Sequence, residues 1–567
     1  MNRNDFLSIF ERSAVLDMPL IAAIWVISLF FVNPLNGNFP LSDDWSYSLT
    51  VKHLLETGEF RPSEWFAPPS LTNALWGSLF CLPAGFSFVA LRLSTLTLSL
   101  LGILAVYVLI RDLGQPRWMA ALGALTMGSN PIYYALSNTF MTDIPFTAIA
   151  IFSALFFARS LKTGSNTDLT LAATLAIAAT LSRQLALALP LAFGFTLIAQ
   201  RGFVIRNLLR AAIPLLLCVG TFVVFSKWLA ATGRMPEIYN QRGGEILHTA
   251  SSPELIIHRL SHAVVSLLYS GLFLLPLSIC AAPDIWRSHR MQLLALFAIT
   301  IATTGLSVGI NALHGHATLM PMFENVMINS GIGPLTLRDT YFLGLDNVPS
   351  LPKGFWLVVT ALSFLGAGLL VGILGVSVID SGRRILARRK VSDREEAGIF
   401  FLLSAVIYLI PVIMGVGIFD RYVVPAIPLF AGAIAGLCRR LPQFNQLQPA
   451  ALRFPVLALL AAFSLFAVGG AHDYLAWNRV RWEALRDLTA NDHVSPEDID
   501  GGFEFNGLYL FDPHYRADPT KSWWWVHRDT YLIGFGNVPG YQVIKEYAYN
   551  SWIPPHAGKV VVLKANP

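Results

Sequence analysis

The sequence predicts a polytopic α-helical membrane protein that ends in a small soluble α/β domain. Only 13% of its 567 residues are charged and 54% are hydrophobic, whereas soluble domains carry roughly 25% charged residues. Apolar runs of about the length that crosses a bilayer as a helix recur over most of the chain. After about residue 470 the composition becomes polar and rich in turn-forming residues, which predicts the separate domain.

About thirteen apolar runs are long enough, or nearly so, to be transmembrane helices. The first run, from about Val15 to Val32, has no Ala-x-Ala cleavage signature, so we expect a retained first span that also directs export. Several runs are short or share a boundary, so the count of thirteen is accurate to within one or two spans. The runs lie near 15–32, 87–110, 117–136, 144–160, 168–183, 184–199, 211–230, 258–282, 291–310, 354–380, 397–418, 422–438 and 454–470.

Basic residues gather in alternate loops and thereby predict the orientation. Threading the thirteen spans in order puts these loops on one side, which the positive-inside bias identifies as the cytoplasm. The N-terminus is then cytoplasmic, and the segments 231–257 and 311–353 face outward with the tail. The same bias explains the net charge of +5, so nucleic acid is not an expected partner. The basic residues are Arg111, Arg117, Arg201, Arg206, Arg210, Arg287, Arg290, Arg383, Arg384, Arg388, Arg389, Lys390, Arg394, Arg439 and Arg440.

We divide the chain into a transmembrane domain, residues 1–470, and an extracytoplasmic α/β domain, residues 471–567. The first outer loop, residues 33–86, should contain interfacial helices, because its apolar positions after Ser42 recur at helical spacing. Ser42 is the expected cap of the first of these helices. The four cysteines are scattered, which excludes both a disulfide framework and a CxxC metal site.

Two adjacent carboxylates, Asp43 and Asp44, directly follow the first apolar run. One interpretation is structural, because acidic residues in a first helical turn stabilise the helix dipole by about 0.3–1 kcal/mol. The other is chemical, because a helix N-terminus favours the ionised carboxylate that a general base or a metal ligand requires. Carboxylates are costly in lipid, so a pair beside a span end suits a water-filled catalytic pocket at the outer membrane face.

Further charged residues fall on the same predicted face. Asp143 starts a helix-like pattern, so helix capping competes with a catalytic role there. Arg183 interrupts apolar sequence on both sides and needs an anion, for which a lipid phosphate would serve. For Arg92, snorkelling to the interface and phosphate binding are equally good explanations, and Asp420 is a sufficient partner for Arg421.

In their order, these motifs resemble those of the GT-C superfamily of membrane glycosyltransferases. The resemblance is strongest to the branch of protein O-mannosyltransferases and lipid A aminoarabinose transferases, and it covers residues 1 to about 470. That branch often carries a Lys-Pro-Pro element late in the first loop, where this chain has Ala67-Pro68-Pro69-Ser70. The resembling elements are Asp43-Asp44, Asp143 within Met-Thr-Asp-Ile-Pro, Arg183 in place of a basic Thr-Lys-Gly element, and Arg421-Tyr422 followed by Pro425 and Pro428.

The resemblance implies an inverting glycosyltransferase, either a hexosyl- or a pentosyltransferase, in a bacterial-type inner membrane. Its donor would be a sugar on undecaprenyl phosphate or another polyprenyl phosphate, and its acceptor a hydroxyl of a glycan, lipid or protein on the outer face. No tightly bound metal is implied, although the three carboxylates together could hold a divalent cation. The implied residues are Asp44, Asp43 and Asp143 for catalysis, with Asp44 slightly favoured as the base, Arg183, Arg92 and Arg421 for the donor phosphate, and Tyr47, His53 and Tyr422 for substrate.

Two other functions stay open at this point. A glycan ligase that uses a diphosphate-linked lipid donor would need a similar site at the outer face. A polytopic transporter would instead show repeated halves and polar groups near the membrane midplane, whereas the informative residues here lie at span ends. The sequence specifies neither the sugar nor the acceptor.

Overall fold

The computed structural model describes most of the chain. The described residues are 3–66, 69–239, 256–386, 391–415, 417–439 and 452–566. Several features of the sequence lie outside them: Ala67 and Pro68, which stand where the resembling family has Lys-Pro-Pro, most of the segment 231–257, and the basic residues Arg388, Arg389, Lys390 and Arg440.

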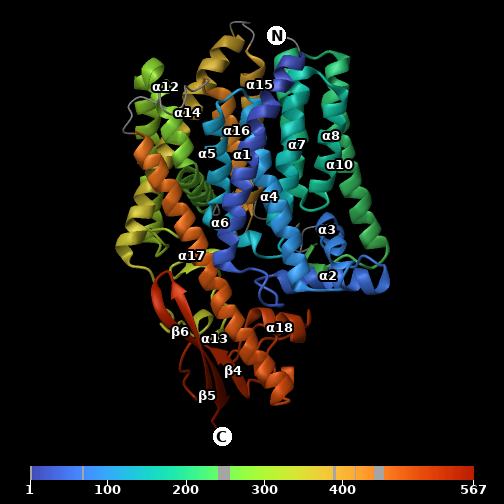
Figure 1. Cartoon of the computed structure of the whole chain (residues 1–567), viewed down its shortest axis with the longest axis vertical. Coiled ribbons are helices and arrows are strands. Elements are labelled where there is room, and N and C mark those ends of the chain that lie inside the picture. Colours follow the sequence, from blue (N-terminus) through green and yellow to red (C-terminus); the bar gives the residue numbers. More distant parts are fainter. Residues whose placement is uncertain are drawn as a thin grey trace.

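The described helices form a bundle, and the strands of the C-terminal part lie beyond one end of it (Figure 1). The long helix α17 runs from the bundle into that part and crosses residue 470, where the sequence predicts the domain boundary. The helices are α1 (Arg3–Val32), α2 (Asp44–Thr57), α3 (Leu71–Cys81), α4 (Phe88–Asp112), α5 (Arg117–Gly128), α6 (Pro131–Ser137), α7 (Asp143–Thr163), α8 (Asn166–Thr180), η1 (Gln184–Leu187), α9 (Ala188–Arg201), α10 (Ile205–Ala231), α12 (Ile256–Leu313), α13 (Arg338–Tyr341), α14 (Lys353–Leu386), α15 (Asp393–Met414), η3 (Asp420–Val423), α16 (Ala426–Leu437), α17 (Arg453–Arg486), η6 (Asp487–Asn491), η7 (Pro496–Asp498) and α18 (Phe503–Leu510).

Nine helices among the described residues are long and apolar enough to cross a membrane. One of them, α12, contains two of the predicted spans and is kinked at His289. Three other predicted spans correspond to shorter elements, namely the apolar part of α1, the pair α5 and α6, and α8. These helices confirm the polytopic helical fold, while the number of thirteen spans stays a prediction.

Charged residues of the predicted cytoplasmic loops pair with one another across the helices. Arg201 lies 3.2 Å from Glu396, and Arg384 lies 2.7 Å from Glu395. Basic loops that are distant in sequence therefore meet at the same end of the bundle. This arrangement agrees with the alternation of basic loops, but the assignment of that end to the cytoplasm stays a prediction.

Glycine allows close helix packing at two places in the bundle. A Cβ atom on Gly398 of α15 would lie 2.8 Å from the backbone of Gly436 in α16, and one on Gly271 of α12 would lie 2.2 Å from the backbone nitrogen of Ala367 in α14. Small residues are the usual means by which membrane helices bring their backbones together.

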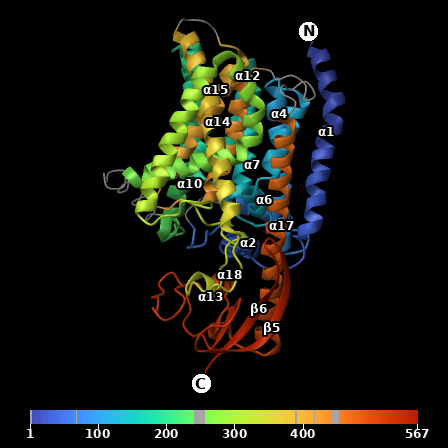
Figure 2. The same cartoon turned by 90° about the vertical axis from the view of Figure 1, so that its left-hand side faces the viewer.

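The C-terminal strands form the sheet β3-β4-β6-β5, which confirms the expected small α/β domain. β3 pairs with β4 in parallel, and the other pairs are antiparallel. β5 and β6 lie beside the C-terminal part of α17 (Figure 2), where Asp473 accepts hydrogen bonds from the backbone of Trp552 and Ile553. The strands are β1 (Met327–Ile328), β2 (Gly331–Ile332), β3 (Ile499–Asp500), β4 (Tyr531–Gly534), β5 (Tyr541–Trp552) and β6 (Pro555–Ala565).

The first loop, residues 33–86, contains two helices, α2 and α3, at the end of the bundle nearest the C-terminal domain (Figure 1). The expected cap at Ser42 is wrong. Ser42 has φ +54°, an uncommon conformation for a residue other than glycine, and the N-cap residue is Asp43, without a side-chain cap bond. The Asp43 carboxylate is therefore directed to other partners.

Candidate functional site

Four of the predicted charged residues meet at this end of the bundle and form two ion pairs. Arg421 Nη2 lies 3.2 Å from Asp43 Oδ2, and Arg183 Nη2 lies 3.0 Å from Asp143 Oδ2. The ring of Tyr422 connects the pairs, because its centroid lies 5.7 Å from Arg183 Cζ and 5.6 Å from Arg421 Cζ. Both distances are within cation–π range.

Asp43 is the more accessible of the adjacent carboxylates, with 18% of its side chain exposed. Its Oδ1 accepts a hydrogen bond of 3.1 Å from the indole Nε1 of Trp65, and its Oδ2 faces Arg421. These two contacts fix the orientation of the carboxylate. Asp43 thus combines oriented carboxylate oxygens with access to the surroundings.

Asp44 is placed differently, since only 2% of the residue is exposed. Its Oδ1 accepts a hydrogen bond of 2.8 Å from the backbone amide of Phe140, and its Oδ2 one of 3.3 Å from that of Leu41. Burial raises the pKa of Asp44 to about 8, and the two amides and Arg92 partly oppose this effect. Asp44 therefore fastens the first loop to the segment between α6 and α7.

Asp143 is fully buried at the start of α7. Among the described residues, neither carboxylate oxygen of Asp143 has a hydrogen-bond partner, although Arg183 is within ion-pair distance. Arg183 Nε instead donates a hydrogen bond of 2.8 Å to Thr142 Oγ1. Thr142 is the N-cap residue of α7 but makes no side-chain cap bond, so its hydroxyl serves the arginine and not the helix end.

The sequence pairs Arg421 with its neighbour Asp420, and the structure corrects this interpretation. Asp420 Oδ2 accepts hydrogen bonds from the backbone amides of Val326 and Met327, at 3.1 and 2.7 Å. Arg421 extends the other way, to Asp43. Adjacent residues in the short helix η3 project in different directions, so sequence proximity does not make them partners.

Arg92 is buried in α4 and donates hydrogen bonds to backbone carbonyls of the first loop. The acceptors are Pro34, Gly37 and Phe39, at 2.5, 3.3 and 2.9 Å. This guanidinium holds the loop that precedes Asp43. Its binding of a donor phosphate stays a prediction.

The three predicted substrate-binding residues occupy different positions. Tyr422 lies between the arginines, as described above. Tyr47 is buried in α2, where its ring packs against that of Phe66 with 4.6 Å between centroids. Burial raises the pKa of its phenol well above the usual value, and the charges of Arg183 and Asp43 lie close enough to affect this pKa as well. His53 lies in the C-terminal half of α2.

Trp65 is a functional candidate that sequence reasoning missed. The sequence places it in the first loop as one of several aromatic residues suited to a membrane interface. Its indole N–H donates a hydrogen bond to Asp43 across a loop. No periodic pattern in the sequence relates these two positions, so the sequence could not predict this contact.

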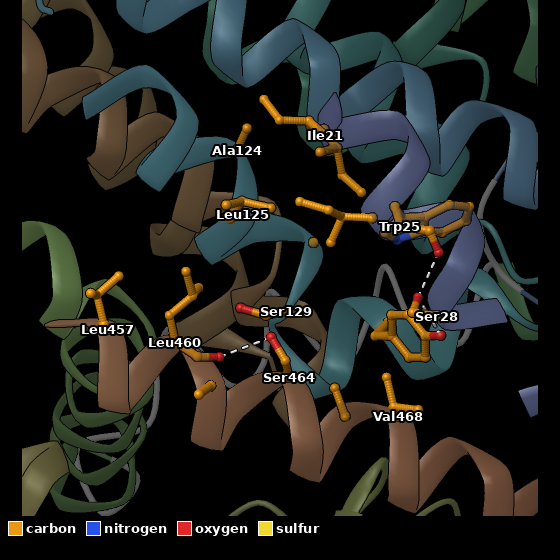
Figure 3. Close-up of a pocket in the computed structure, with 16 residues that line it drawn as sticks. Ile21, Trp25, Ser28, Ala124, Leu125, Ser129, Leu457, Leu460, Ser464 and Val468 are labelled. Carbon is orange, nitrogen blue, oxygen red and sulfur yellow. Dashed lines mark hydrogen bonds between the residues drawn. The ribbon is translucent and has the colours of Figure 1, made fainter. Parts of the chain in front are cut away.

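No group of three or more His, Cys, Asp or Glu residues within the described ranges is arranged to hold a metal ion. A cavity of about 330 Å³ lies between α1, α5 and α17, and its lining is mostly apolar (Figure 3). Trp25, Leu125 and Leu460 are among its lining residues. It contains none of the predicted site residues.

Residues 69–230 match the model of the family described as dolichyl-phosphate-mannose-protein mannosyltransferase. The matched segment includes Asp143 and Arg183 but neither Asp43 nor Arg421. No curated protein matches the chain in sequence. The family match supports a membrane glycosyltransferase of the GT-C superfamily and does not distinguish between its branches.

Three solved structures are similar to this chain at low identity. Archaeal oligosaccharyltransferase AglB from Archaeoglobus fulgidus is 15% identical over 90% of this chain, with a TM-score of 0.44. The chain spans 62% of the length of that protein. ArnT from Cupriavidus metallidurans bound to undecaprenyl phosphate is 14% identical over 97% of this chain and 98% of its own, with a TM-score of 0.39. The Pmt1-Pmt2 complex of S. cerevisiae bound to the sugar donor is 15% identical over 39% of this chain and 34% of its own, with a TM-score of 0.30.

Proposed function

We propose that this chain is an inverting glycosyltransferase that moves a sugar from a polyprenyl-phosphate carrier to an acceptor hydroxyl at the outer membrane face. The observation that carries the proposal is the meeting of Asp43 with Arg421, beside Arg183 and Tyr422. Such a site offers a base and two phosphate-binding groups within one small region. The description of the matching family, a transferase that uses dolichyl-phosphate mannose, supports a donor of this class.

Asp43 is the proposed general base. Asp44 is less suitable, because backbone amides occupy both of its oxygens. An ionised Asp43 removes the proton of the acceptor hydroxyl while the acceptor oxygen forms a bond to the anomeric carbon. The bond from that carbon to the phosphate oxygen breaks, and the phosphate keeps the electron pair. A single displacement of this kind inverts the anomeric centre.

Arg183 and Arg421 are the proposed phosphate-binding groups. Guanidinium groups present several N–H donors in a plane and bind phosphate oxygens in pairs. In the proposed scheme, a bound phosphate draws Arg421 away from Asp43 and releases the carboxylate to meet the acceptor. Arg421 Nε, which is buried and has no hydrogen-bond partner among the described residues, adds one free donor for this exchange.

Asp143 and Tyr422 are proposed to orient the arginines and not to exchange protons. Asp143 supplies the charge that holds Arg183 in a buried position, and Tyr422 presents its ring to both guanidinium groups.

We further propose that this end of the bundle faces outward, because the basic loops that contain Arg201 and Arg384 meet away from it. The leaving phosphate needs no general acid, because the arginines stabilise its negative charge.

The proposal is tested with the full chain purified into lipid nanodiscs. Radiolabelled sugars on undecaprenyl phosphate are incubated with this preparation and a crude envelope acceptor, and a parallel reaction supplies sugars on undecaprenyl diphosphate. Transfer from the monophosphate donor is expected. Transfer from the diphosphate donor alone would identify a glycan ligase, and the absence of transfer from either donor to any acceptor would contradict the proposed enzyme.

A further inference from the structure

The turn that carries Asp43 is held by the C-terminal domain. Glu504 of α18 accepts a hydrogen bond of 3.0 Å from the backbone amide of Ser42 through Oε1. Its Oε2 accepts hydrogen bonds of 2.7 Å from Arg481 Nη1 and from Thr336 Oγ1. The side chains of Arg481 and Glu504 are both fully buried. A carboxylate held from two sides in this way has a fixed position from which to hold the Ser42 amide.

Aromatic packing fixes the residues that flank Asp43 against the same domain. The ring of Trp45 is buried, and its centroid lies 5.3 Å from that of Phe511 and 5.5 Å from that of Trp525. Trp65, which donates to Asp43, lies 5.0 Å from the same Trp525 ring. Both tryptophans that position the Asp43 carboxylate and its turn therefore rest on one aromatic cluster.

Gly507 permits this close approach of α18. A Cβ atom at this position would lie 2.3 Å from Cε2 of Trp45, far inside van der Waals contact. The helix can lie against the indole only because the residue has no side chain. The conformation of Ser42, with φ +54°, adds a reason for support, since residues other than glycine rarely hold this backbone geometry unaided.

We infer that α18 is a positioning element for the catalytic carboxylate, with Glu504 as its positioning residue. The inference rests on the proposed function of Asp43. Glu504 does not touch the reacting groups; it acts through the Ser42 amide, one residue before Asp43. The C-terminal domain then belongs to the catalytic machinery as the support of the base.

A positioning role and a purely structural role predict different kinetics. Displacement of Asp43 weakens proton removal in the transition state, so kcat falls, while KM for the donor, whose phosphate is bound by the arginines and not by Asp43, changes little. A general loss of stability reduces the amount of folded enzyme and leaves the kinetic parameters of the folded fraction unchanged. Asp529 provides a matched control, because it forms an ion pair of 2.6 Å with Arg338 in the same part of the fold.

The test compares Glu504→Ala, Glu504→Gln and Asp529→Asn in the full chain. At equal amounts of folded protein, we expect Glu504→Ala to lower kcat at least tenfold with KM for the donor within twofold. Glu504→Gln should recover part of this loss, because its amide oxygen still accepts a bond from Ser42 while its NH2 group replaces the oxygen that accepts from Arg481 and Thr336. The Asp529→Asn enzyme should stay within twofold of wild type. Equal effects of Glu504→Ala and Asp529→Asn on kcat would overturn the inference.

Hydrogen exchange gives a second readout that does not depend on catalysis. Glu504→Ala should raise exchange in the peptide around Ser42, and Asp529→Asn should not. If Glu504→Ala fails to fold, Gly507→Ala serves instead, because its methyl group displaces Trp45. Unchanged exchange in the Ser42 peptide would overturn the inference, whereas absence of transfer by the wild type with raised exchange in the variant would overturn only the proposed function.

Discussion

Replacing Arg183 by glutamine should leave the Asp143 carboxylate buried without its cation. Asp143 is fully buried, and its oxygens have no hydrogen-bond partner among the described residues. Removing one partner of a buried ion pair typically costs about 3–5 kcal/mol. The lost hydrogen bond to Thr142 adds about 0.5–1.5 kcal/mol. The double variant Asp143→Asn/Arg183→Gln carries neither charge, so its loss should be well below the sum of the two single losses.

Thermal unfolding in detergent provides the assay for this cycle. The four cysteines are all buried, so a thiol-reactive fluorophore reports their exposure as the chain unfolds. A control variant, Arg234→Gln, breaks a more exposed pair with Glu59 and should cost less than about 1 kcal/mol. Single losses that simply add in the double variant would refute the pairing of Asp143 with Arg183.

Two further predictions concern the adjacent carboxylates. Trp65→Phe keeps an aromatic ring but removes the hydrogen bond to Asp43, so we expect kcat to fall about tenfold, in line with the roughly 1–1.5 kcal/mol of such a bond; a steady-state rate equal to that of the wild type would contradict this role. Burial raises the pKa of Asp44 from 3.8 to about 8. Between these two pH values the folded protein retains a proton that the unfolded chain has released. The free energy of unfolding should therefore fall by up to about 1.4 kcal/mol for each unit by which the pH rises. Asp44→Asn should flatten this dependence when thermal midpoints at pH 5 and pH 8 are compared, and an unaltered pH dependence would count against it.

The sequence predicts the general arrangement because membranes impose strong patterns on it. Apolar runs of fixed length and alternating basic loops predict the helices, and they place Asp143 and Arg183 at related span ends. The prediction that these residues share the membrane face of the first loop depends only on that regular threading. The C-terminal domain is likewise visible in the change of composition.

Contacts between distant segments leave no such pattern. Adjacent residues at a helix start point in different directions, since each residue turns an α-helix by about 100°, so the sequence could not separate the roles of Asp43 and Asp44. The support from Glu504 reaches Ser42 across most of the chain length. Arg92 looks like a membrane-interface arginine until the carbonyls of the folded first loop are placed around it.

In the proposed mechanism, Asp43 removes the acceptor proton while Asp44 anchors the loop. Single-turnover transfer from a radiolabelled polyprenyl-phosphate sugar, measured in nanodiscs at equal amounts of folded protein, tests it directly. We predict that Asp43→Asn slows transfer by a factor of about 10²–10⁴, whereas Asp44→Asn stays within about tenfold of wild type, since it loses at most one backbone hydrogen bond. Transfer that survives in Asp43→Asn and disappears in Asp44→Asn would contradict the claim.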